Sequence, residues 1–129
     1  MERYNFELFD PPAPFTRVEI RSQERDTILR EIPMLLDSGA DVTLVPKSCA
    51  EELGLSIDAD QAYELMGFNG SISFAPVARF ELKFINRIFK GRFLLIDQEW
   101  GIMGRDVLNH LSIVLDGPNL QWSETPRDH

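Results

Sequence analysis

The stretch that decides the fold runs Met34-Leu35-Leu36-Asp37-Ser38-Gly39-Ala40-Asp41. Its apolar residues predict a buried strand that ends at Asp37 and delivers a carboxylate to a tight loop. Gly39 allows the backbone to turn sharply there, so that neighbouring N–H groups point back at the acid. By itself, Asp-Ser-Gly is a weak signal, because many ordinary turns after a buried strand have the same composition.

A second stretch far downstream, Ile102-Met103-Gly104-Arg105-Asp106, makes the signal of the first one specific. Together the two resemble the signatures of the retropepsin-like aspartic proteases, which read apolar-apolar-Asp-Ser/Thr-Gly-Ala and, later, apolar-apolar-Gly-Arg-Asp/Asn. The resemblance covers roughly residues 15 to 122 of the chain. It divides the sequence into an N-terminal strand and proline-rich extension at 1–14, a protease-like domain at 15–123 and a polar tail at 124–129.

The resemblance implies an active site that one chain cannot complete. The sequence has one Asp-Ser-Gly motif and, at 129 residues, has room for one lobe. A working enzyme would therefore be a C2 homodimer in which Asp37 of each subunit meets its copy on the axis. Such a pair of carboxylates shares a proton and activates water to hydrolyse an extended peptide, without a metal, a cofactor or a covalent intermediate.

The same resemblance assigns supporting roles around Asp37. Ser38, Gly39 and Ala40 are expected to hold the catalytic loop, the Ser38 hydroxyl by a hydrogen bond across the dimer. Asp41 is expected to contact the substrate backbone and to pair, partly buried, with Arg105. The plainer alternative for these two residues is a solvated surface pair of little energetic value.

A hairpin that covers the cleft, the flap of this family, is expected at Gly67, Phe68, Asn69 and Gly70, which would bind substrate. Asn-Gly is a strong signal for a two-residue hairpin turn, because both positions tolerate positive φ. An ordinary surface hairpin would carry the same signal, and the segment lacks a Gly-Gly tip.

Short alternating segments separated by turn residues predict a mainly β domain, a small closed barrel with one or two short helices. The expected strands lie at 4–8, 15–20, 27–36, 78–84, 88–96, 111–115 and 120–122, and the expected helices at 47–53 and 105–110.

Composition restricts the partners and the compartment. Thirteen basic against 21 acidic residues give a net charge of −8, which argues against nucleic acid or an anionic membrane as a partner. No apolar stretch approaches the roughly 20 residues of a membrane helix. A single cysteine, Cys49, excludes an internal disulfide and favours a reducing, cytoplasmic setting. The two histidines, His110 and His129, lie far from Cys49 in sequence, so a zinc or Cys-His site has little support.

Two other interpretations remain open. The chain could be a non-catalytic, dimeric peptide-binding or scaffolding module that keeps the fold and Asp37. It could also be a monomeric β-barrel unrelated to proteases, in which Asp37 is dispensable. The oligomeric state separates the last interpretation from the other two, because a strict monomer cannot complete the dimeric site.

Overall fold

The computed structural model describes residues 2–22, 24–55, 57–66 and 72–125. Ten strands and two short helices make up this part of the chain. The strands are β1 (Glu2–Arg3), β2 (Phe15–Ser22), β3 (Thr27–Leu36), β4 (Leu44–Pro46), β5 (Ile57–Met66), β6 (Ile72–Phe84), β7 (Arg87–Ile96), β8 (Gly101–Met103), β9 (Ile113–Asp116) and β10 (Gln121–Glu124). The helices are α1 (Lys47–Leu53) and α2 (Arg105–Leu108).

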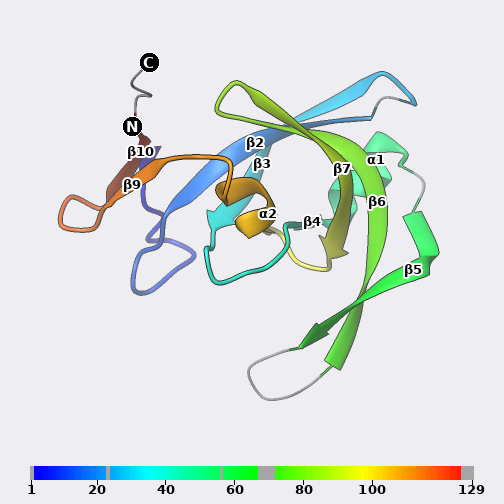
Figure 1. Cartoon of the computed structure of the whole chain (residues 1–129), viewed down its shortest axis with the longest axis horizontal. Helices are drawn as coiled ribbons and strands as arrows, with labels where there is room; N and C mark the ends of the chain where they lie inside the picture. The colour runs from blue at the N-terminus through cyan, green and yellow to red at the C-terminus, as the bar shows by residue number, and fades with distance from the viewer. Residues whose placement is uncertain (1, 23, 56, 67–71, 126–129) are drawn as a thin grey trace.

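Six strands form a closed barrel. The sheet order is β2-β3-β8-β4-β7-β6-β5, and an additional pairing between β2 and β6 closes the ring. β5 pairs with β6 outside the ring, and the two project from the barrel as a long hairpin (Figure 1). Closure leaves the six ring strands without a free edge.

The barrel interior is filled by side chains that alternate along the strands, as the pleat requires. Ile20 of β2, Met34 of β3, Leu82 of β6 and Met103 of β8 are all fully buried there. α1 covers one side of the barrel with Cys49, Ala50 and Leu53 facing inward. The helix ends at Gly54, whose positive φ of 68° is the left-handed conformation typical of a glycine helix stop.

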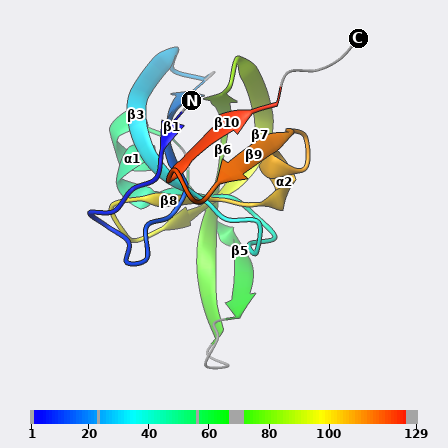
Figure 2. The ribbon, with the colours of Figure 1, turned by 90° about the vertical axis from the view of Figure 1, so that its left-hand side faces the viewer.

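A second, three-stranded sheet with the order β1-β10-β9 packs against the barrel (Figure 2). Trp122 of β10 fixes it in place, because its indole N–H donates to the Phe15 carbonyl oxygen at 2.9 Å. The Trp122 ring is buried and lies against Phe84, with ring centroids 5.8 Å apart. The aromatic ring thus joins the two sheets through packing and one hydrogen bond.

The predicted fold class is confirmed: the chain is mainly β, with a closed barrel and two short helices. The strands expected from residue 15 onward are present, and all but one agree with their predicted limits within two residues. The exception is β6, which begins at Ile72, six residues before the expected start. The helix expected at 105–110 is shorter, since α2 ends at Leu108. Among the described residues, none of the helices has the length and apolarity needed to span a membrane.

The strand predicted at 4–8 is wrong. β1 covers Glu2–Arg3 alone, and the segment after it turns around Asn5. The Asn5 side-chain oxygen accepts hydrogen bonds from the backbone N–H groups of Glu7 and Leu8, at 3.0 and 2.8 Å. A short polar side chain that captures nearby backbone donors competes with strand pairing, which is why the alternating pattern fails here.

Candidate active site

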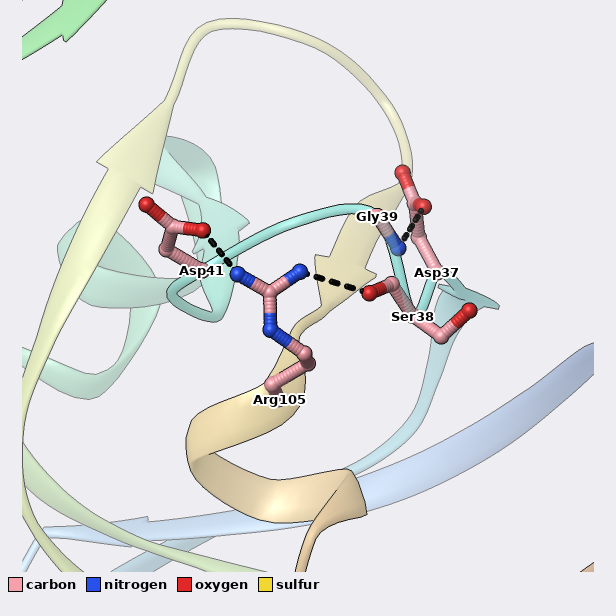
Figure 3. A network of polar contacts seen from close by, with 5 residues as sticks. All are labelled: Asp37, Ser38, Gly39, Asp41 and Arg105. Carbon is pink, nitrogen blue, oxygen red and sulfur yellow. Dashed lines mark hydrogen bonds and ion pairs between the residues drawn. The ribbon is translucent and has the colours of Figure 1, made fainter.

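The acid Asp37 lies half-buried at the end of β3, on a loop held by backbone hydrogen bonds. Its own N–H donates to the Met103 carbonyl oxygen of β8 at 3.0 Å, and its carbonyl oxygen accepts from Ala40 N–H at 3.1 Å. One carboxylate oxygen accepts the Gly39 N–H at 2.9 Å (Figure 3). The turn therefore orients the carboxylate through the N–H group that the sequence predicted for this role.

Strand pairing brings the two sequence motifs together. β3 and β8 run parallel, with Leu35 opposite Ile102 and Leu36 opposite Met103. Where β8 ends, the backbone passes directly against the loop that follows Asp37. A Cβ on Gly104 would lie 2.5 Å from the Val42 carbonyl oxygen, so this position excludes every side chain. The close approach of the two backbones therefore requires glycine at position 104.

Arg105, the first residue of α2, connects both ends of the loop from Ser38 to Asp41. Its guanidinium donates to the Ser38 carbonyl oxygen at 2.7 Å and forms an ion pair with the Asp41 carboxylate (Figure 3). Its backbone N–H donates to the Ala40 carbonyl oxygen at 2.9 Å. Three separate contacts from one residue thus fix the loop that carries Asp37.

The Asp41–Arg105 ion pair is present, but it is not partly buried as expected. The Asp41 side chain is 80% exposed and that of Arg105 is 42% exposed in the single chain. An ion pair with this exposure contributes about 0–1 kcal/mol to folding by itself. Asp41 is consequently accessible to a ligand or to a second chain.

Sequence reasoning missed a polar network beneath the loop, formed by Thr43 and Asp106. The fully buried Thr43 donates its hydroxyl to one Asp106 carboxylate oxygen at 2.6 Å and its N–H to the other at 3.1 Å. The same hydroxyl accepts the Gly104 N–H at 3.0 Å. The available signal was Thr43 between the apolar residues Val42 and Leu44, together with the acid that ends the second motif.

A small apolar cluster, distinct from the main core, lies on the strands next to this loop. Leu44, Val77 and Leu94 form its buried part. Val42, Ile96 and Ile102 pack on it and are partly exposed. Since Val42 belongs to the loop and Ile102 pairs beside Leu35, apolar surface adjoins the acid.

The other predicted site residues fall into two groups. Ser38 and Gly39 are exposed on the loop surface, while Ala40 is half-buried. The flap residues Gly67, Phe68, Asn69 and Gly70 lie outside the described residues, and the prediction for them stays a prediction. In the part of the chain that is described, no group of three or more His, Cys, Asp or Glu residues is arranged to hold a metal ion.

Comparisons with known proteins agree with this geometry. The model of a family described as "gag-polyprotein putative aspartyl protease" matches residues 29–110, which include both motifs. Among solved structures, EIAV protease complexed with the inhibitor HBY-793 is 27% identical, with a TM-score of 0.56. That match covers 83% of this chain and 91% of the viral one. No curated protein matches the sequence significantly.

Proposed function

Because the chain belongs to the gag-polyprotein aspartyl protease family, we propose that it is an aspartic endopeptidase that acts as a homodimer. Each subunit contributes one Asp37. The observation that carries this proposal is the fixed, half-buried acid of the β3 loop, held by Gly39 N–H, by β8 and by Arg105. One such acid per chain makes half of a two-carboxylate site.

The proposed chemistry needs the two carboxylates and a water molecule. Two carboxylates in contact cannot both ionise cheaply, so they share one proton and titrate as a pair, as in known aspartic-protease dyads. The ionised Asp37 removes a proton from water while the water oxygen bonds to the peptide carbonyl carbon. The protonated Asp37 gives its proton to the carbonyl oxygen. The Asp37 that took the water proton then gives it to the amide nitrogen, while the other Asp37 takes a proton back from a hydroxyl of the tetrahedral intermediate. Cleavage of the C–N bond releases the amine and the carboxylic acid, and the pair again shares one proton.

The surroundings of Asp37 suit an extended peptide. Such a peptide can bind as an added strand, using main-chain hydrogen bonds. The Asp41 side chain is exposed, and its second carboxylate oxygen could accept a hydrogen bond from a substrate N–H. The small apolar cluster around Val42 and Ile102 supports a preference for apolar side chains next to the cleaved bond. The β5–β6 hairpin would cover the bound strand and exclude water.

Peptide-library cleavage by wild type and Asp37→Asn, read by mass spectrometry from acidic to neutral pH, tests the proposal. Asp37→Asn should lower cleavage at least about 1,000-fold, because an amide cannot accept the proton from water. A statine-type transition-state mimic should block the wild-type cuts. Asp26→Asn is the matched control, since Asp26 lies in the exposed β2–β3 turn at a positive φ that asparagine also tolerates.

A wild-type protein that is folded and dimeric but cuts no peptide would contradict the enzymatic proposal. The fold would then serve the alternative function of a dimeric peptide-binding or scaffolding module. Direct binding of the statine mimic, measured by calorimetry, would identify that case, because a binding cleft persists without turnover. Equal cleavage by wild type and Asp37→Asn would exclude an aspartic mechanism altogether.

A further inference from the structure

The first part of β7 extends past the short contact through which β4 closes the ring against it. That contact consists of the pairs Leu44↔Leu94, Val45↔Leu95 and Pro46↔Ile96. Residues 87–93 are paired with β6 on one side, and no described strand pairs with them on the other. This segment, the β7 edge, shares a cavity of about 700 Å³ with residues of α2, which lies beside it (Figure 2). Ligand-binding pockets typically have volumes of about 300–1,000 Å³.

The backbone of the β7 edge presents polar groups to this cavity at every second residue. Leu94 donates its N–H to the Thr43 carbonyl oxygen at 3.3 Å, so its backbone groups face the β4 side. The pairing of β7 with β6 has no register shift, so this orientation recurs at every second residue back along the strand. Arg92, Lys90 and Ile88 therefore direct their N–H and C=O groups toward the cavity. An unpaired row of such groups is a template for an additional strand.

Exposed cations lie on the outer face of the sheet at this edge, although the chain has a net charge of −8. Lys90 forms an ion pair with Glu81 at 3.5 Å, and its side chain is still 68% exposed. Arg92 is exposed and lies directly opposite the exposed Arg79 of β6. Like charges in directly opposite positions destabilise a sheet, and an anion bound beside them offsets that cost.

The inner side of the cavity is apolar. Val107 of α2 is buried in its wall, and Phe89 lies against His110, with ring centroids 6.0 Å apart. Asp106 is the one acid among the described residues of the lining, and both of its carboxylate oxygens are bonded to Thr43. A strand at the β7 edge therefore meets apolar side chains on one face and cations on the other.

We propose that the β7 edge binds an extended segment of another protein in which acidic and apolar residues alternate. The segment joins the sheet as a strand, through hydrogen bonds with the backbone of Ile88, Lys90 and Arg92. Its acidic side chains lie on the outer face beside Lys90 and Arg92, because side chains of neighbouring strands share the same two faces. Its apolar side chains lie on the inner face, against Phe89 and Val107.

An acidic peptide suits this groove better than a nucleic acid does. The net charge of −8 repels a phosphate backbone, which also cannot pair strand-like with alternating N–H and C=O groups. The lining contains none of residues 37–41, so the groove is separate from the cleft at Asp37. The inference therefore does not depend on whether the chain is a peptidase.

Fluorescence anisotropy with a labelled Val-Glu-Val-Glu-Val-Glu-Val-Glu peptide tests the site on the full chain. Asp37→Asn serves as the background, so that the probe stays intact. Adding Lys90→Gln with Arg92→Gln should weaken binding about 10-fold, because two partly exposed charge pairs are lost. Arg17→Gln with Lys47→Gln is the matched control: it changes the net charge equally at exposed residues of β2 and α1 and should have little effect. Equal losses in the two double variants would overturn the inference.

Amide hydrogen exchange followed by NMR locates the bound peptide without a change in the groove. Saturation with the peptide should slow exchange at Ile88, Lys90 and Arg92 by about 10-fold or more, because their N–H groups then donate to the added strand. Phe89 and Gly91 direct their N–H groups toward β6 and should change little. Unchanged exchange at the three edge amides while the peptide is bound would overturn the inference.

Control probes separate the other possible occupants. A Val-Lys peptide of the same length and a DNA octanucleotide should each bind at least about 10-fold more weakly than the Val-Glu peptide. Equal or tighter binding of either would overturn the inference. A statine-type mimic should not displace the Val-Glu peptide, and displacement would place the peptide in the Asp37 cleft instead. Self-association of the chain that is lost in Lys90→Gln with Arg92→Gln would identify a second copy as the occupant and would also overturn the inference.

Discussion

Asp106→Ala is the sharpest test of how the catalytic loop is held. The change removes both acceptors of the buried Thr43, leaving its hydroxyl and its N–H without the bonds of 2.6 and 3.1 Å. Hydrogen bonds to a charged group contribute about 1.5–3 kcal/mol each. Asp106 itself is exposed, so water can reach part of the vacated space and the lower end applies. We expect the free energy of unfolding to fall by about 2–3 kcal/mol.

A double-mutant cycle isolates the Thr43–Asp106 interaction. Thr43→Val keeps the shape of the side chain but loses the hydroxyl, so the cycle with Asp106→Ala should give a coupling energy of about 1–2 kcal/mol. Asp106→Asn retains one oxygen acceptor and should cost about half as much as Asp106→Ala. Asp97→Ala, at another exposed aspartate, is the matched control and should change stability by less than about 0.5 kcal/mol.

Urea unfolding followed by far-UV circular dichroism is the assay. All variants must be compared at one protein concentration, because the proposed dimerisation would make apparent stability depend on concentration. Stability of Asp106→Ala within about 0.5 kcal/mol of wild type, or an additive cycle, would refute the argument that this pair secures the loop.

Three further perturbations follow from the geometry. Gly104→Ala places a Cβ against the Val42 carbonyl oxygen and should cost about 3 kcal/mol or more in a thermal melt; an unchanged melting temperature would contradict the close approach. Burial raises the pKa of the Cys49 thiol, so its native reaction with a disulfide reagent near pH 8 should be at least about 10-fold slower than in urea; equal rates would disprove this. The Asn119 side chain lowers the pKa of Asp116 below its ordinary 3.8, so this pairing stabilises the fold above that pH and is lost as the pH falls through the lowered value. Asn119→Ala should remove this contribution to the loss of stability as the pH falls below 3.8, and identical acid melts of the variant and wild type would argue against it.

The sequence allowed the architecture to be predicted where local pattern and tertiary structure agree. Alternation along β2, β3, β6 and β7 identified those strands, because one face of each packs in the barrel. The motif around Asp37 identified the loop, and Gly39 N–H does donate to the carboxylate. The segment around Asn5 failed, because its side chain binds backbone donors that a strand would have used.

The rest of the site depends on distant partners. Thr43 and Asp106 lie 63 residues apart, and no local sequence pattern around either residue predicts that the two interact. The exposure of Asp41 depends on where α2 places Arg105 beside the loop, which hydrophobic periodicity does not predict. The order of the three-stranded sheet likewise becomes known only from the structure, in which β10 lies between β1 and β9. The flap residues at 67–70 stay a prediction.

The long separation between the loop and its supports has a consequence for the newly made chain. The contacts that fix residues 38–43 come from Gly104, Arg105 and Asp106, between 61 and 67 positions later. During synthesis, the ribosome therefore exposes Asp37 long before the groups that orient it exist. Contacts of such separation also form late in folding, because closing a long loop has an entropic cost. The loop that carries Asp37 therefore gains the contacts that orient it only after residues 104–106 have been made.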